Sequence, residues 1–427
     1  MGVGRASGKL WSERGRRIEE SPISAMMAQA LAEPGLISLA AGFVDYSTLP
    51  VEEVRRALEG MLADDSAARA ALQYGTTKGL PSLRERLARR IARLDGVPYG
   101  TRGYSADNVI IGTGSQQLLY LLTEVLLAPG DIVILGHPSY FVFMDALKAG
   151  GASCRSVPLD DEGMRADLLE KLLGSMKKRG ELGRVRMLYL VSYYENPTGI
   201  SLSARRRRAI WRLVKKYFAG ERMHVVEDAA YRELRYAGRD VASLRSLDRS
   251  GKRSISLGTF SKSLSPGLKT GYGLFPPDVA AKVEHLKGAH DFGSNNFTQH
   301  LLDRLLADGS YDRHVRRLRA GYRRKLLATT EAIDRWRPPG VRRTDPTGGL
   351  YVWLTLPEGV DAGPGSPLFH AALRRHVIYV PGEFCFAPGS DGPVPANSIR
   401  LSFGVGNVAR IREGVRRLAE AVKECLT

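Results

Sequence analysis

The chain has 427 residues, with 63 Lys or Arg against 45 Asp or Glu, so its formal net charge is +18. Its 43% hydrophobic and 25% charged residues are typical of globular proteins and exclude disorder as the dominant state. Three cysteines exclude a disulfide framework and, without C-x-x-C spacing, disfavour a structural zinc site. No apolar run is long enough to span a membrane, so we expect a cytoplasmic protein.

In chain order, residues 1–50 predict an N-terminal arm, with an amphipathic helix over 22–31, that packs with a small C-terminal domain. Residues 51–305 alternate short apolar runs with helical patterns. The runs 109–111, 132–135, 187–191 and 224–227 predict buried strands, and the stretches 116–127, 141–149, 164–179 and 204–218 predict helices. Continuous apolar strands that alternate with helices predict an α/β domain whose mainly parallel sheet lies between helices.

The pattern changes after residue 305. A long helical pattern runs from Tyr311 toward Trp336, and it is followed by strand patterns over 350–355 and 399–403 and by a closing helix. This order predicts a small α+β domain over 306–427.

The densest basic run is Arg205–Arg208, which opens a helical pattern with apolar residues at 210, 213, 214, 217 and 218. We interpret the run as the solvated face of an amphipathic helix. Nucleic-acid binding is a weaker alternative, because no helix-turn-helix, zinc-finger or RNA-binding pattern accompanies the charge.

Three polar motifs follow predicted strands, where the sheets of α/β proteins meet their ligands. The segment 112–117, GTGSQQ, precedes a helix and is typical of an anion site, although a plain turn has the same pattern. The segment 192–199, SYYENPTG, by itself indicates a turn. Asp228 ends the last strand, with Tyr231 following it, and is either a ligand-binding carboxylate or a helix N-cap.

Two further segments hold cations. In 258–273, GTFSKSLSPGLKTGYG, Lys262 lies among small and hydroxyl residues, which suits either an amine that forms a Schiff base or a Ser/Gly-rich surface loop. In NSIRLSFG, Arg400 has the planar group that binds carboxylates, although a surface charge is the common case.

The joint order of these segments resembles that of the fold-type I pyridoxal-phosphate enzymes of the class I/II aminotransferase family. The resemblance runs from about Ile37 to the end, and it includes ISLAAG, QYGTTKGLPSLRERLARRI and VPGEFCFAPG. The aminoadipate and kynurenine aminotransferases, and the enzyme-like domain of the MocR regulators, are the most similar branch. The resemblance implies pyridoxal 5'-phosphate as cofactor, a homodimer, and transfer of an amino group from an L-amino acid to a 2-oxo acid.

The resemblance also implies roles for single residues. Lys262 would hold the cofactor and move a proton at the substrate α-carbon, and Asp228 would pair with the pyridine nitrogen. Tyr231 and Asn196 would bond the phenolic oxygen, and Tyr140 would stack on the ring. The remaining assignments are the phosphate ligands Gly114, Ser115, Gln116, Thr259, Ser261 and Lys269, the substrate residues Gly42, Asn196 and Arg400, and Tyr74, which would reach the neighbouring subunit's phosphate.

Several residues depart from the family pattern. Lys269 stands where the family usually has Arg. His137 precedes the proline of the ring-stacking segment, either as a neutral residue packed behind the site, which is favoured, or in contact with the site. Residues 22–27, PISAMM, lack the arginine that can bind the acidic side chain of the substrate in aminoadipate-type enzymes, so a hydrophobic or aromatic substrate is favoured. Glu195 before Asn196 is unusual and has no explanation at this level, and the bond from Asn196 to Pro197 is expected to be cis.

Two alternatives remain open. The same fold also supports lyase, decarboxylase and oxidase reactions, since the bond that breaks depends on the pose of the substrate. A MocR-like regulator is disfavoured, because the matched region begins near Ile37 and leaves little chain ahead for a winged helix.

Overall fold

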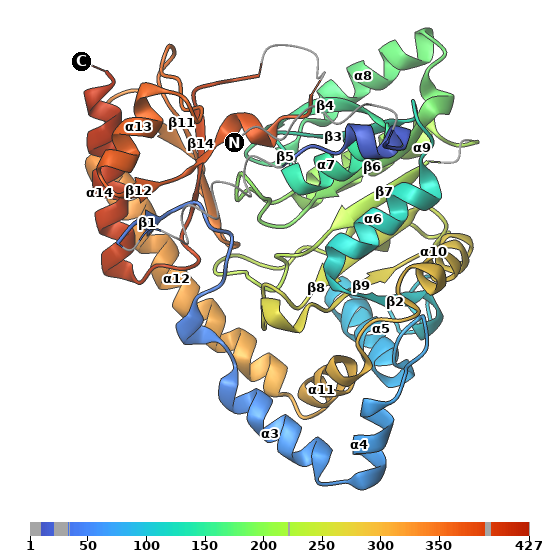
Figure 1. The fold of residues 1–427 in the computed structure, drawn as a ribbon. Helices are drawn as coiled ribbons and strands as arrows, with labels where there is room; N and C mark the ends of the chain where they lie inside the picture. The colour runs from blue at the N-terminus through green and yellow to red at the C-terminus, as the bar shows by residue number, and fades with distance from the viewer. Residues whose placement is uncertain (1–9, 21–32, 34, 221–222, 389–393, 427) are drawn as a thin grey trace.

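The computed structural model describes residues 10–20, 33, 35–220, 223–388 and 394–426 (Figure 1). The helix expected over 22–31, and the PISAMM stretch within it, lie outside the described residues. Within the described residues, no helix has the length and apolar character needed to cross a membrane.

An eight-stranded sheet forms the centre of the larger part of the molecule, in the order β2-β9-β8-β7-β6-β3-β4-β5. Its strands are β2 (Val109–Gly112), β3 (Ile132–His137), β4 (Ser153–Asp160), β5 (Gly163–Met164), β6 (Val185–Val191), β7 (His224–Asp228), β8 (Ser254–Thr259) and β9 (Gly271–Leu274). Strands β8, β7, β6, β3 and β4 are mutually parallel, whereas β9 runs antiparallel to β8 and β2, and β5 antiparallel to β4. The expectation of a mainly parallel sheet is confirmed.

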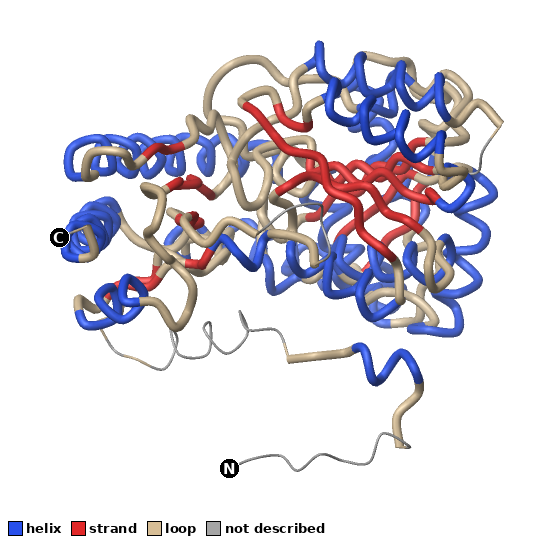
Figure 2. Tube along the Cα trace, turned by 90° about the horizontal axis from the view of Figure 1, so that it is seen from above, coloured by secondary structure: helices blue, strands red, loops and turns tan. Residues whose placement is uncertain are grey.

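Helices cover both faces of this sheet, as the view from above shows (Figure 2). Strand β3 explains why: Val133 and Leu135 join one apolar cluster and Ile132 and Ile134 join another, so both faces of the strand are buried. The first cluster includes α6 (Gly114–Leu126) and α7 (Phe141–Gly150), and the second includes α8 (Ala166–Lys178) and α9 (Ala204–Tyr217). All four helices match helices expected from the sequence.

The sequence patterns did not predict the remaining helices of this part. They are α3 (Val51–Leu62), α4 (Asp65–Leu72), α5 (Pro81–Asp95), α10 (Pro277–Asp291) and α11 (Asn296–Ala307), with a short α1 (Glu13–Arg17) in the arm. Their ends are chemically marked: Asp64 caps α4, Pro81 opens α5, and Gly96 ends α5 in the left-handed conformation. Across both parts, the described residues also contain six short 3-10 helices: η1 (Tyr46–Thr48), η2 (Ala106–Asn108), η3 (Leu182–Arg184), η4 (Leu244–Leu247), η5 (Pro266–Leu268) and η6 (Gly382–Cys385).

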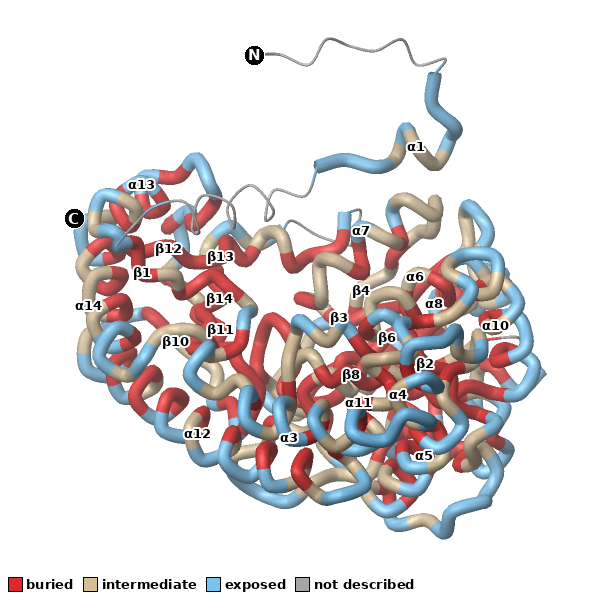
Figure 3. The backbone as a smooth tube through the Cα atoms, turned by 60° about the horizontal axis from the view of Figure 1, so that its bottom comes forward, coloured by how far each residue is buried: buried red, intermediate tan, exposed pale blue. Residues whose placement is uncertain are grey.

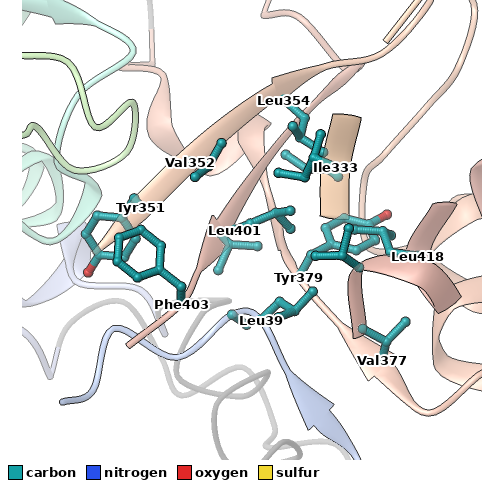
Figure 4. Packing of buried hydrophobic residues seen from close by; sticks show 14 of the residues in the cluster. Leu39, Ile333, Tyr351, Val352, Leu354, Val377, Tyr379, Leu401, Phe403 and Leu418 are labelled. Atoms are coloured by element: carbon teal, nitrogen blue, oxygen red, sulfur yellow. The ribbon is translucent and has the colours of Figure 1, made fainter. Parts of the chain in front are cut away.

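A four-stranded antiparallel sheet forms the smaller part, in the order β10-β11-β14-β13. Its elements are β10 (Arg342–Arg343), β11 (Tyr351–Thr355), β13 (Val380–Pro381) and β14 (Ser398–Ser402), with α12 (Ser310–Trp336), α13 (Pro367–Arg374) and α14 (Val408–Glu424). Figure 4 shows Val352 and Leu401 of this sheet packed with Ile333 and Leu418 of the helices and with Leu39 from the N-terminal segment. Because β1 (Ile37–Ser38) pairs with β12 (Val377–Ile378), this part of the N-terminal segment joins the C-terminal part of the chain.

The basic run on α9 corrects an expectation. Arg205 and Arg208 are exposed, but Arg206 is buried and Arg207 is 2% exposed. Arg207 Nη1 lies 2.5 Å from Glu227 Oε1 of β7, which forms a buried ion pair. The solvated-face interpretation is wrong for these two residues because four consecutive positions span a full helical turn, so some must face the sheet.

Candidate active site

The polar motifs meet at one edge of the large sheet. Asp228 is paired with Val191 of β6 on one side and with Leu257 of β8 on the other. Gly271 is paired with both Thr259 and Gly112, because β9 is antiparallel and therefore begins at the edge where β8 ends. The register thus brings together the start of α6, the turn after β8, Asp228 and the turn after β6, which are far apart in sequence.

Lys262 lies in the turn that follows β8, and its side chain is half-buried. Its Nζ donates a hydrogen bond to the backbone oxygen of Gly42 at 2.9 Å. Gly42 belongs to the segment that packs with the smaller part, so the amine stands between the two parts of the molecule. The alternative of a plain surface loop is wrong for Lys262.

Asp228 is buried at the end of β7. Its Oδ2 accepts a hydrogen bond from the hydroxyl of Tyr189 at 3.0 Å, and its Oδ1 accepts one from the amide of Ala230 at 3.0 Å. Burial raises the pKa of Asp228, and both hydrogen bonds oppose this. No helix follows Asp228 directly, so the N-cap alternative is wrong. Sequence reasoning missed Tyr189, although it is the one hydroxyl in the apolar run 187–191.

Tyr231 contacts a second tyrosine, Tyr351, whose place in the site the sequence did not predict. Its hydroxyl lies 3.2 Å from that of Tyr351, the first residue of β11. A Cβ added at Gly42 would lie 2.6 Å from Tyr351 Oη, so the absence of a side chain there lets this hydroxyl approach. Burial and the nearby Tyr351 raise the pKa of Tyr231 well above its ordinary range. The tyrosines therefore join the large sheet to the smaller part at the edge where Asp228 lies.

Arg400 lies on β14 and is 2% exposed. Its Nη1 donates to Asn196 Oδ1 at 2.8 Å, and its Nη2 donates to the backbone oxygen of Ala40 at 2.7 Å. The buried Nε has no hydrogen-bond partner among the described residues. The rings of Tyr351 and Phe141 flank the guanidinium, whose Cζ lies 4.5 Å and 5.5 Å from the two centroids. The surface-charge alternative for Arg400 is therefore wrong.

The turn that carries Asn196 has the expected backbone. The peptide bond between Asn196 and Pro197 is cis, and so is the bond between His137 and Pro138. The ring of His137 packs against Phe386 with centroids 4.4 Å apart, and burial lowers the pKa of His137. His137 is thus the neutral packed residue that the sequence favoured.

The start of α6 forms a close contact with β9. Gly114 opens the helix with φ +74°, and Ser115 and Gln116 follow in its first turn. A Cβ added at Gly271 would lie 2.4 Å from the amide nitrogen of Ser115, so only glycine fits there. The first backbone N–H groups of a helix have no partner within it, so this end is suited to an anion.

Hydroxyls from the turn after β8 lie at the same edge. The Thr259 hydroxyl donates to Ser261 Oγ at 2.9 Å and accepts from the Ser261 amide at 3.2 Å. Lys269 is exposed, in the left-handed conformation, and forms no ion pair among the described residues. The buried Oε1 of Gln116 likewise has no hydrogen-bond partner within the described part of the chain.

Two aromatic predictions have different outcomes. Tyr140 precedes α7, and burial together with the nearby charge of Asp228 raises its pKa, so its hydroxyl belongs to the cluster. Tyr74, which follows α4, is 83% exposed, and its ring contacts Phe292 at 5.7 Å between centroids. The structure does not join Tyr74 to the cluster of its own chain.

These groups fit pyridoxal 5'-phosphate. A buried carboxylate suits a protonated ring nitrogen, an amine suits an aldehyde, and a helix start surrounded by hydroxyls suits a phosphate. The unpartnered Gln116 Oε1 and Arg400 Nε are buried polar atoms, which folded proteins normally pair. Their positions at this edge indicate that a polar ligand completes the site.

Comparisons with known proteins agree with this geometry. The family "Aminotransferase class I and II" matches residues 34–418. The aromatic-amino-acid aminotransferase 1 of Thermococcus litoralis is 35% identical, over 97% of this chain and 94% of that protein. The 2-aminoadipate transaminase of Thermus thermophilus is also 35% identical, over 97% and 98%. The crystal structure of Pyrococcus horikoshii kynurenine aminotransferase, in complex with PMP, is 35% identical, with a TM-score of 0.89 over 98% of each chain.

The match of family, sequence and fold extends over nearly the whole chain, and the residues at the sheet edge are of the kinds that the fold-type I cofactor requires. The chain belongs to the class I and II aminotransferase family and is a pyridoxal 5'-phosphate-dependent transaminase of amino acids.

Proposed function

We propose that Lys262 is the residue that holds the cofactor and that Asp228 faces its ring nitrogen. The observation that carries this proposal is the placement of Asp228 at the end of β7 and of Lys262 in the turn after the adjacent strand β8. Lys262 contacts Gly42 there, and Arg400 of the smaller part contacts Ala40 and Asn196. Ser115, Gln116, Thr259, Ser261 and Lys269, with the backbone at Gly114, would hold the phosphate. Tyr140 would cover the ring.

Pyridoxal 5'-phosphate, when bound, supplies an aldehyde that accepts the amino group and a ring that stabilises negative charge on the substrate α-carbon. The chain supplies the proton movements and the orientation. Lys262 Nζ, released from Gly42, would accept the proton of the substrate α-carbon and donate it again during the transfer. Asp228 would keep the ring nitrogen protonated, and the hydrogen bond from Tyr189 holds its carboxylate in place for that role.

Arg400 positions the substrate by its α-carboxylate. Its planar guanidinium can pair with both carboxylate oxygens, and its hydrogen bonds to Asn196 and Ala40 fix its plane before substrate arrives. Tyr231 and Asn196 would bond the phenolic oxygen of the cofactor, and the backbone at Gly42 would line the substrate side.

We further propose that the amino donor has a hydrophobic or aromatic side chain. The rings of Phe141 and Tyr351 flank Arg400, and the described contacts of Arg400 include no second cation that would attract an acidic side chain. The relative from Thermococcus litoralis is named for aromatic amino acids, whereas the one from Thermus thermophilus is named for 2-aminoadipate.

We also propose a homodimer in which Tyr74 reaches the phosphate of the neighbouring site. Its exposure supports this, as do exposed apolar side chains on α3 and α4, in η1 and after α10: Val51, Leu62, Leu72, Tyr46 and Phe292. In Figure 3, which brings the bottom of Figure 1 forward, α3 and α4 lie on the near face and carry exposed residues. We propose the same division into domains as the sequence predicts: an arm of 1–50, a large domain of 51–305 and a small domain of 306–427. The pairing of β1 with β12 supports the packing of the arm against the small domain.

Three free cysteines suit a cytoplasmic location.

The test is a spectral screen of the holoenzyme. Phenylalanine, tyrosine, leucine, glutamate and 2-aminoadipate are added singly, and the conversion of the cofactor to its amine form is followed by absorbance. We expect faster conversion with the first three, and 2-oxo acids should reverse it. Release of ammonia or carbon dioxide without conversion would contradict transamination, and a preference for the two acidic donors would contradict the side-chain proposal.

A further inference from the structure

Glu195 is a buried acid that none of the roles above uses. It is 5% exposed and directly precedes Asn196, the residue that orients Arg400. Its Oε2 accepts a hydrogen bond from the Thr198 hydroxyl at 3.1 Å, and no cation in the described part of the chain forms an ion pair with it. An ionised carboxylate in such a place is strongly disfavoured, because it has lost water and gained no counter-charge.

The surroundings of Glu195 are mainly apolar. A small cavity of about 10 Å³ beside it is lined by groups that include Leu159, Met164 and Ile200. The titratable groups that lie near it on other elements are the hydroxyl of Tyr189 on β6 and the thiol of Cys385 in η6. Burial raises the pKa of both, and a charge on Glu195 would raise it further.

Neither His137 nor Arg400 supplies Glu195 with a positive charge. His137, beside Gly136 at the end of β3, is kept neutral by burial, which lowers its pKa. Arg400 also lies near Cys385, but its Nη groups bond Asn196 and Ala40 instead of Glu195. The carboxyl group is therefore enclosed without a counter-ion.

The same residue closes the turn that presents Asn196. The amide of Glu195 donates to the Ile200 oxygen at 2.8 Å, and the amide of Gly199 donates to the Glu195 oxygen at 2.6 Å. The Ile200 amide donates to Thr198 Oγ1 at 3.2 Å, and that hydroxyl donates in turn to Glu195 Oε2. Backbone and side chain of Glu195 thus tie both ends of the turn around Asn196.

A negative charge at this point would disturb both ends of the active site. Tyr189, which faces Glu195, donates to Asp228, so a second carboxylate there would compete with Asp228 for the same electrostatic role. It would also offset part of the positive charge of Arg400, which the substrate carboxylate needs.

We propose that Glu195 is a positioning residue that acts as a neutral carboxylic acid: it closes the turn that presents Asn196 to Arg400 and, by staying uncharged, leaves the charge of Arg400 to the substrate. This role rests on the proposed function of Arg400 as the carboxylate-binding residue. It makes Glu195 equivalent to a glutamine in shape and charge.

Kinetics of two variants separate shape from charge. Glu195→Gln keeps both, so its KM for the amino donor at pH 7 should stay within about twofold of the wild-type value. Glu195→Ala removes the acceptor for Thr198 and should raise KM by about tenfold. Toward alkaline pH, the wild-type KM should rise as Glu195 ionises, and the KM of Glu195→Gln should not. A KM raised equally by Gln and Ala at pH 7, or identical alkaline profiles for wild type and Glu195→Gln, would overturn the proposal.

Two readouts need no substrate and test Glu195 apart from catalysis. An infrared difference spectrum between wild-type and Glu195→Gln holoenzyme at pH 7 should contain the carbonyl stretch of a protonated carboxyl group, and a carboxylate band in its place would overturn the proposal.

The second readout is stability against pH. Burial raises the pKa of Glu195 above its ordinary value of 4.5. Its stabilising contribution is thus complete below pH 4.5 and is lost as the pH rises toward the raised value.

Thermal unfolding should show this sign. The melting temperature of Glu195→Gln should gain on that of the wild type as the pH rises above 4.5, whereas the exposed control Glu358→Gln should show a constant difference. A constant difference for Glu195→Gln would overturn the neutral acid. A wild-type enzyme that binds the cofactor but transfers no amino group would instead refute the proposed function, and it would leave these two measurements interpretable.

Discussion

Arg400 shows how one side chain is fixed for its task before substrate arrives. Its guanidinium is buried between two rings, and its hydrogen bonds to Asn196 and Ala40 set its plane. The Nε remains without a partner within the described residues. A buried cation with unused hydrogen-bonding capacity favours an anionic ligand, because only an anion restores what burial removed.

Replacing Arg400 by lysine therefore tests the planar fork while the charge is kept. Arg400→Lys should raise KM for the amino donor by about tenfold to a hundredfold and change kcat less, because the lost contact acts on binding and orientation. Steady-state kinetics at saturating cofactor measure this, with the exposed Arg412→Lys as control. An unchanged KM would remove Arg400 from the substrate site.

At the same scale, the sequence predicts residues by type and context, and it misses residues placed only by packing. Lys262, Asp228 and Arg400 stand in recognisable segments, and the structure brings all three to one edge. Tyr189 and Tyr351 lie in apolar strand patterns in which a tyrosine is usual, so nothing local marks their hydroxyls as polar partners. Their roles arise from the register of neighbouring strands.

At the scale of elements, β9 shows the limit of pattern reading. Gly271–Leu274 holds two glycines and reads as part of a loop, yet it is an interior strand between β2 and β8. Glycine is required there by close backbone approach, which the sequence does not display. The strands and helices with continuous or periodic apolar residues, such as β3, α6 and α12, were predicted because burial itself dictates their pattern.

Gly271 gives a prediction for the phosphate end of the site. In Gly271→Ala, the new Cβ would meet the backbone of Gly114 and Ser115 at 2.4–2.5 Å, so the start of α6 must shift. We expect the cofactor to bind at least about tenfold more weakly, because the helix start no longer has its geometry. Titration with pyridoxal 5'-phosphate measures this. Gly267→Ala, whose Cβ would have ordinary contacts, is the control, and equal affinities in the two variants would contradict the account.

The ion pair between α9 and β7 gives a prediction on stability. Arg207→Met leaves Glu227 buried without its partner, and we expect it to lower the free energy of unfolding by about 3–5 kcal/mol. Arg208→Met removes the same charge from the surface next to it and should cost less than about 0.5 kcal/mol. Urea unfolding of both variants measures the two losses in free energy of unfolding. Equal losses would show that the ion pair does not stabilise the fold.

At the scale of the whole molecule, the site needs both ends of the chain. Gly42 and Ala40 come from the N-terminal segment before α3, Arg400 from the last strand, and Lys262 from between them. This assembly follows from the β1–β12 pairing, which joins residues more than three hundred positions apart and leaves no local pattern in the sequence. The order of the motifs indicated the family, whereas contacts between the parts required the structure.

The proposed dimer makes a prediction that only two chains together can satisfy. Tyr74→Phe should weaken the cofactor by about tenfold, since one hydrogen bond to a charged phosphate is lost. Lys262→Ala alone should be inactive. Mixed and refolded together at limiting cofactor, the two variants should regain about one quarter of the wild-type sites, the statistical share in a two-fold dimer. No recovery, or a monomer in sedimentation, would contradict the shared site.

The most direct test of the account is to locate the cofactor on the chain. The holoenzyme is reduced with borohydride, digested, and searched by mass spectrometry for the lysine that carries the pyridoxyl group. The account predicts the label on Lys262, with none in the Lys262→Ala protein. A label on another lysine, or the same label in that variant, would contradict it.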